Sequence, residues 1–62
     1  MAIRELRVFW ATATHRCVLY RVDGTLELWL RTGDRVTALA TCRDLTDAGT
    51  LAQQWLDRLH TF

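Results

Sequence analysis

The dipeptide Asp23-Gly24 limits the folds open to this chain more than any other feature, because it separates two runs that alternate apolar and polar residues. Asp-Gly is a strong signal for a two-residue hairpin turn, since both central residues of a type I′ turn need a positive φ. Such a turn joins two antiparallel strands and sets which residues face each other. The sequence therefore predicts a β-hairpin of residues 16–22 and 25–31.

This register sorts the hairpin side chains onto two faces, because successive side chains of a strand point to opposite sides of the sheet. Counting outward from the turn sets Leu19 opposite Leu28 on one face and Val18 opposite Trp29 on the other. The first of these faces is the more aliphatic, so we expect it to form the core. Its members are Cys17, Leu19, Leu26, Leu28 and Leu30.

A further strand is predicted on each side of the hairpin. Residues 4–11 contain Val-Phe-Trp, which favours a strand, although the Arg, Glu and Leu residues beside it leave a helix open. Residues 35–42 form the fourth strand after a turn at Thr32-Gly33-Asp34. We expect a three-residue loop there, because it sets Leu30 opposite Val36 and keeps both residues in the core.

Apolar residues after position 44 recur every three or four positions, which is typical of an amphipathic helix of about four turns. Asp44 or Thr46 can cap the start of this helix. Consecutive strands usually pair with their neighbours, which favours the order 1-2-3-4. The predicted fold is therefore α+β: a four-stranded antiparallel meander with one C-terminal helix packed on one face (ββββα).

The size and charge of the chain exclude several classes of protein. Its 62 residues make one domain, 1–62, because a second core could not be built from so few. The formal net charge of +1 is too small for a protein that binds duplex DNA mainly by charge. No apolar run approaches the roughly 20 residues of a membrane span, and no signal-peptide pattern opens the chain, so we expect a cytoplasmic protein without a membrane partner.

The face away from the helix should be polar in such a fold, but the predicted register makes it largely apolar. A contiguous apolar patch on a small domain usually marks an interaction site. Trp29 is the expected central anchor, and Trp29→Ala is expected to weaken association without unfolding the chain. The predicted contact surface consists of Arg7, Phe9, Val18, Tyr20, Trp29, Arg31, Arg35 and Leu39, with Glu5, Val22, Glu27, Thr37 and Thr41 on the same face.

Three partners fit this surface. The leading hypothesis is a second copy of the chain, since a domain this small gains stability by forming a homodimer. The alternatives are single-stranded nucleic acid, because aromatic and arginine side chains on a sheet can stack with bases, and a different protein. Glu5 and Glu27 argue against nucleic acid, because they repel phosphate.

Catalysis is not expected. The chain contains no serine, and Cys17 faces the predicted core, where a thiol is inert. No phosphate-binding loop is expected, since Gly24, Gly33 and Gly49 are isolated glycines. The soft ligands His15, Cys17, Cys42 and His60 do not have the spacing of a zinc finger or ribbon. We therefore predict a small binding or assembly module, not an enzyme, with no metal site and no cofactor.

Overall fold

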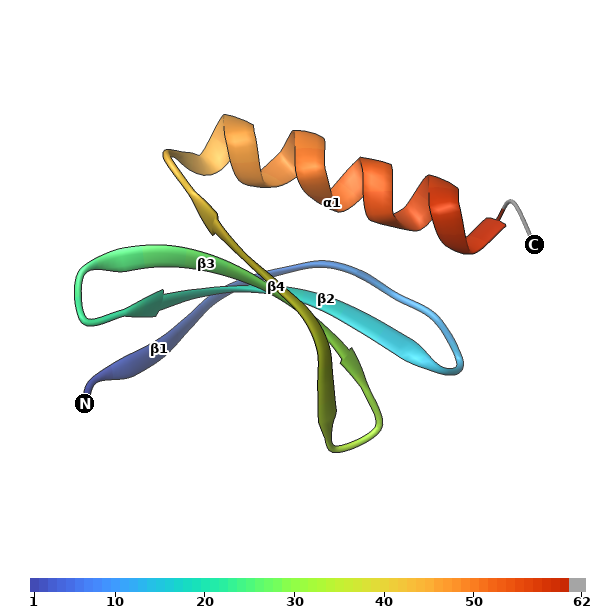
Figure 1. The fold of residues 1–62 in the computed structure, drawn as a ribbon, viewed down its shortest axis with the longest axis horizontal. Helices are drawn as coiled ribbons and strands as arrows, with labels where there is room; N and C mark the ends of the chain where they lie inside the picture. Colours follow the sequence, from blue (N-terminus) through green and yellow to red (C-terminus); the bar gives the residue numbers. More distant parts are fainter. Residues whose placement is uncertain (61–62) are drawn as a thin grey trace.

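A computed structural model describes residues 1–60 of the chain. It contains four strands followed by one helix: β1 (Ile3–Ala11), β2 (His15–Val22), β3 (Thr25–Thr32), β4 (Arg35–Cys42) and α1 (Leu45–His60). The strands form one antiparallel sheet in the order β1-β2-β3-β4. The predicted ββββα fold is confirmed, and residues 4–11 belong to a strand (Figure 1).

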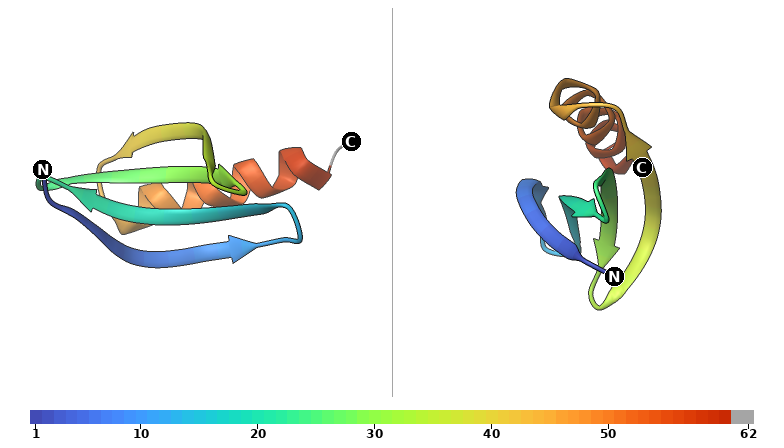
Figure 2. Two further views of the ribbon diagram at one scale, coloured as in Figure 1. Left: turned by 90° about the horizontal axis from the view of Figure 1, so that it is seen from below. Right: turned by 90° about the vertical axis from the view of Figure 1, so that its left-hand side faces the viewer.

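The sheet is strongly twisted, and α1 lies along one of its faces (Figure 2). Throughout the part of the chain that the structure describes, no helix or strand covers the opposite side of the sheet. We call that side the open face and the other the helix side. This two-layer arrangement leaves the side chains of the open face to be covered only by one another.

The central hairpin has the predicted turn and register. Asp23 and Gly24 have φ values of 50° and 86°, as a two-residue turn of the primed type requires. Leu19 pairs with Leu28, and Val18 pairs with Trp29. The turn is also tied to the start of β1, because the backbone N–H of Ala2 donates to Asp23 Oδ1 at 2.8 Å.

Two β-bulges in β1 change the predicted faces of that strand. Pairing with β2 is interrupted between Glu5 and Arg7 and again between Val8 and Trp10, and each bulge adds one unpaired residue. Arg7 therefore pairs with Leu19 on the helix side, and Phe9 packs against the core. The predicted position of Arg7 and Phe9 on the open face is wrong, because strict alternation fails at a bulge.

A third irregularity makes the pairing of β3 with β4 differ from the predicted one. The turn has two residues, Gly33-Asp34, and the register then shifts by one residue near Leu30. Leu30 consequently faces Ala38 instead of the predicted Val36. This shift of two positions keeps residues 38–42 on their predicted faces, because the side-chain period of a strand is two.

The same irregularity places residues 35 and 36, which precede the bulge in β4, on the faces opposite to those predicted. Arg35 pairs with Thr32, which lies on the helix side, whereas Val36 pairs with Arg31 on the open face. The prediction that Arg35 belongs to the open face is therefore wrong. The predicted core position of Val36 is wrong for the same reason, and its side chain is 46% exposed.

The core lies between the sheet and α1. Its buried members are Cys17, Leu19, Leu28, Cys42, Ala48 and Ala52. Alanines at the centre of the helix let it approach the sheet closely, and Leu51 and Trp55 pack around them. Trp10 joins the two layers, because its indole N–H donates to the carbonyl of Ala52 at 2.8 Å.

Asp44 caps the helix, as the sequence allowed. Its Oδ1 accepts from the backbone N–H of Asp47 at 2.8 Å, while Asp47 Oδ2 accepts from the N–H of Arg43 at 3.0 Å. The first bond satisfies an N–H group of the first helical turn, which has no partner within the helix, and the second ties the residue before the cap to that turn. The two carboxylates are thus accounted for by capping.

Candidate functional site

The open face contains one apolar line of side chains that crosses the whole sheet. Cross-strand pairing connects Val8 to Val18, Val18 to Trp29, and Trp29 to Leu39. We call these four residues the apolar row. They come from four different strands, so the row runs perpendicular to the strands from one edge of the sheet to the other.

Exposure increases from the middle of the apolar row to its ends. Val18 is only 1% exposed and Trp29 is half-buried, whereas Val8 is 38% and Leu39 is 52% exposed. Val18 is buried without any covering element, because it sits between Val8 and Trp29 and is shielded by both. The row therefore presents a large aromatic centre with exposed aliphatic ends.

Trp29 is held in a defined position. Its ring lies 4.4 Å from that of Tyr20 between centroids, tilted by 41°. The indole N–H of Trp29 donates to Glu27 Oε1 at 3.0 Å, and Arg31 donates to the hydroxyl of Tyr20 at 3.1 Å. A large aromatic side chain fixed in this way can contact a partner without losing much conformational entropy.

Charged residues flank the apolar row on both sides, separated by sign. The acidic row consists of Glu5, Tyr20, Glu27 and Thr41, which pair in that order across the sheet. The basic row, on the other side, consists of Ala11, Arg16, Arg31 and Val36. The open face thus changes from acidic to apolar to basic along the strand direction.

The structure brings together five of the eight predicted contact residues. Val18, Tyr20, Trp29, Arg31 and Leu39 lie on the open face, with Val18 and Tyr20 buried by their neighbours. Arg7, Phe9 and Arg35 lie on the helix side, as described above.

Among the residues of the open face that the prediction missed are Ile3, Val8, Arg16 and Val36. Ile3 pairs with Val22 and lay outside the predicted strand, while Val8 and Val36 reach the face through bulges, for which the sequence holds no clear signal. Arg16 could have been found by continuing the alternation back from Val18.

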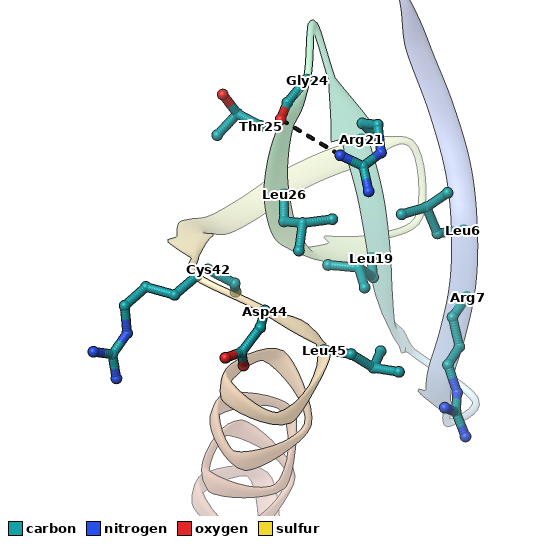
Figure 3. A pocket seen from close by; sticks show the side chains of 11 residues that line it. Leu6, Arg7, Leu19, Arg21, Gly24, Thr25, Leu26, Cys42, Asp44 and Leu45 are labelled. Carbon is teal, nitrogen blue, oxygen red and sulfur yellow. Dashed lines mark hydrogen bonds between the residues drawn. The ribbon is translucent and has the colours of Figure 1, made fainter.

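A groove lies on the helix side, near the β2–β3 turn (Figure 3). It has a volume of about 750 Å³ and is lined by leucines from three strands and the helix start: Leu6, Leu19, Leu26 and Leu45. We call it the leucine groove. Arg21 extends over it and donates to the carbonyl of Gly24 at 3.5 Å. The groove exists because α1 begins beside Leu26 and runs away from the turn.

The two cysteines are buried free thiols. Burial, and to a lesser extent the nearby Cys42, raises the pKa of Cys17 to about 11. Burial also raises the pKa of Cys42, with Asp47 and Asp44 adding to the effect against a hydrogen bond from the backbone of Leu28. A thiol that stays protonated at neutral pH is a poor nucleophile, so neither cysteine is suited to covalent catalysis.

Comparison with known proteins adds no assignment: no protein-family model, curated protein or solved structure matches the chain significantly. Within residues 1–60, no three His, Cys, Asp or Glu side chains are grouped so that they could hold a metal ion. No helix in the same range is long and apolar enough to cross a membrane. The open face is the feature of the described chain that most needs a functional explanation.

Proposed function

We propose that the chain is a non-catalytic assembly module that forms a homodimer through its open face. The observation that carries this proposal is the apolar row, which crosses all four strands and ends in Leu39, 52% exposed. A half-buried aromatic with exposed aliphatic neighbours is typical of the centre of a protein–protein interface.

Further exposed aliphatic residues lie on the same face. Ile3 is 49% and Val36 46% exposed, and both sit outside the apolar row. Burying them together with Leu39 and Val8 removes apolar surface from water, which is the main driving force for association. A chain of 62 residues buries a smaller share of its surface than a larger domain and gains correspondingly from a partner.

The charges on the open face favour a protein partner over nucleic acid. Arg16 and Arg31 could approach phosphates, but Glu5 and Glu27 lie on the same face and repel them. Equal numbers of both signs give this face no net attraction for a polyanion. Single-stranded nucleic acid therefore serves as an alternative outcome of the test.

Leu39→Glu tests the proposal, with Leu45→Glu as its matched control. Both leucines are 52% exposed, but Leu39 lies on the open face whereas Leu45 lines the leucine groove. Sedimentation equilibrium across the micromolar range should show the wild type and Leu45→Glu at twice the 7.2 kDa of one chain. Leu39→Glu should remain at the mass of one chain, because it buries a carboxylate in the interface.

A wild type that stays monomeric over this range would overturn the proposal. Equal dimerisation of both variants would also overturn it, because the interface would then lie elsewhere. Fluorescence polarisation with a labelled single-stranded oligonucleotide at low salt completes the test. Tight binding that Leu39→Glu weakens would assign the open face to nucleic acid instead.

A further inference from the structure

The order of the three rows on the open face specifies how a second copy would be oriented. We propose that two copies stack their open faces about a twofold axis that runs along the apolar row, so that the basic row of each copy lies over the acidic row of the other. This inference rests on the proposed function and adds to it the geometry of the contact and the residues that select the partner.

The charged rows lie at similar distances on the two sides of the apolar row. On β3, Glu27 and Arg31 lie two residues to either side of Trp29, and on β2 Tyr20 and Arg16 lie two residues to either side of Val18. At about 3.3 Å per residue, each charged row is roughly 7 Å from the apolar row. On β3, the backbone positions of Glu27 and Arg31 are therefore symmetric about Trp29.

A twofold axis along the apolar row determines which rows of the two copies meet. This axis keeps the apolar row in place on the partner but exchanges its two flanks. Arg31 of one copy then lies over Glu27 of the partner subunit, and the reverse pair forms by symmetry. Arg16 lies over the partner's Tyr20, between the partner's Glu5 and Glu27. Apolar surface meets apolar surface, and Arg31 meets a glutamate directly. Glu5 lies over the partner's Ala11, next to the partner's Arg16, so the remaining charges have an opposite charge beside them.

The competing orientation is disfavoured by the same charges. A twofold axis parallel to the strands would keep each flank on its own side, so the basic rows would meet each other and the acidic rows would meet each other. Like charges brought together across an interface oppose association. The charges on the open face thus favour one of the two orientations in which the apolar rows of two copies could stack.

The favoured axis also matches the way in which sheets pack. Each strand lies over its own copy in the partner, running in the opposite direction, which makes an aligned β-sandwich. Two sheets packed in this way are about 10 Å apart, a distance over which a long arginine side chain can reach a glutamate. The helices then cover the two outer surfaces of the sandwich.

The isolated chain places two like charges opposite each other, and the proposed arrangement would bring carboxylates near them. Arg16 and Arg31 are directly opposite each other on β2 and β3, and like charges in that position destabilise a sheet. Carboxylates of a second copy would neutralise them. Two of the contacting groups are already oriented, because Glu27 accepts from Trp29 and Arg31 donates to Tyr20.

Charge reversal tests the geometry. We would prepare an acidic-row variant, Glu5→Arg/Glu27→Arg, and a basic-row variant, Arg16→Glu/Arg31→Glu. Each alone should have a dimer dissociation constant at least ~10-fold higher than the wild type, because like charges then face each other. An equimolar mixture of the two should form a heterodimer, in which the acidic row of one chain faces the basic row of the other on one flank. On the other flank of this heterodimer, the substituted row of one variant, now basic, faces the substituted row of the other variant, now acidic.

The control variant is Arg35→Glu/Arg58→Glu, which makes the same change in net charge as the basic-row variant at two exposed positions away from the open face. It should dimerise like the wild type. Circular dichroism identifies any variant that fails to fold, and Glu5→Gln/Glu27→Gln then replaces the acidic-row variant. The wild-type dissociation constant should rise with ionic strength, and this glutamine variant should lose most of that dependence.

The outcomes separate this proposal from the one on which it rests. A monomeric wild type overturns both. A wild type that dimerises, with Leu39→Glu disrupting the dimer but charge reversal having no effect, retains the homodimer and overturns this orientation. Failure of the mixed variants to form a heterodimer also overturns it.

Discussion

Trp29 has two roles that a single substitution cannot separate. It shields Val18 and stacks on Tyr20, which are 1% and 7% exposed, and it also presents the remaining part of its ring to solvent. Trp29→Ala would therefore uncover two buried residues as well as removing the expected interface anchor. The structure changes the expectation that this substitution leaves the fold intact, and Leu39 is the better position for a test.

The buried thiols give the folded chain a pH-dependent stability. The pKa of Cys17 rises from an ordinary value of 9.0 to about 11 in the folded chain, so folding favours its protonated form. That contribution is complete below about pH 9 and is lost as the pH rises through about 11. The free energy of unfolding, measured by urea denaturation, should therefore fall between these pH values.

Cys17→Ala provides the comparison for this measurement. The variant should be less stable at neutral pH, because it leaves a small cavity, but its stability should fall less steeply above pH 9. An identical slope for the two proteins would show that Cys17 does not titrate with folding.

The elements differ in how far the sequence could specify them. The hairpin of β2 and β3 was predictable pair by pair, because a two-residue Asp-Gly turn permits only one register. The helix was equally accessible, since its apolar spacing and Asp44 cap are local signals. The placement of Arg7, Phe9 and Arg35 was not, because each follows from a bulge in an outer strand. The position of a bulge depends on how the strand packs against the next layer, and the local sequence pattern does not reveal this packing.

Gly24→Ala should destabilise the hairpin by about 1–2 kcal/mol, because an alanine at a φ of 86° strains the backbone. No atom lies within 4 Å of the added Cβ, so steric contact cannot be the cause of any loss. Chemical denaturation of both proteins measures the difference. Gly49→Ala is the control, since its Cβ would make an ordinary contact of 3.6 Å with Phe9 and the helix should tolerate it or gain stability. Equal stability of wild type and Gly24→Ala would contradict the strained-turn explanation.

At the scale of the whole molecule, folding and association should be linked. The core between sheet and helix is small, with six buried residues in the described chain. A partner that binds only the folded form raises its stability by mass action. The melting temperature of the wild type should therefore rise with protein concentration, whereas that of Leu39→Glu should not. A concentration-independent melting temperature for both would contradict this linkage.

The bulges in β1 and β4 have a consequence for how far assembly can proceed. Both strands lie at the edges of the sheet, where an unpaired backbone could otherwise recruit strand after strand from other chains. Leu6 and Phe9 on one edge and Thr37 on the other break the regular ladder that such growth requires. Polymerisation through the edges is thereby hindered, while the proposed stacking would use up the open face of both copies. An assembly formed in the proposed way should therefore stop at two copies.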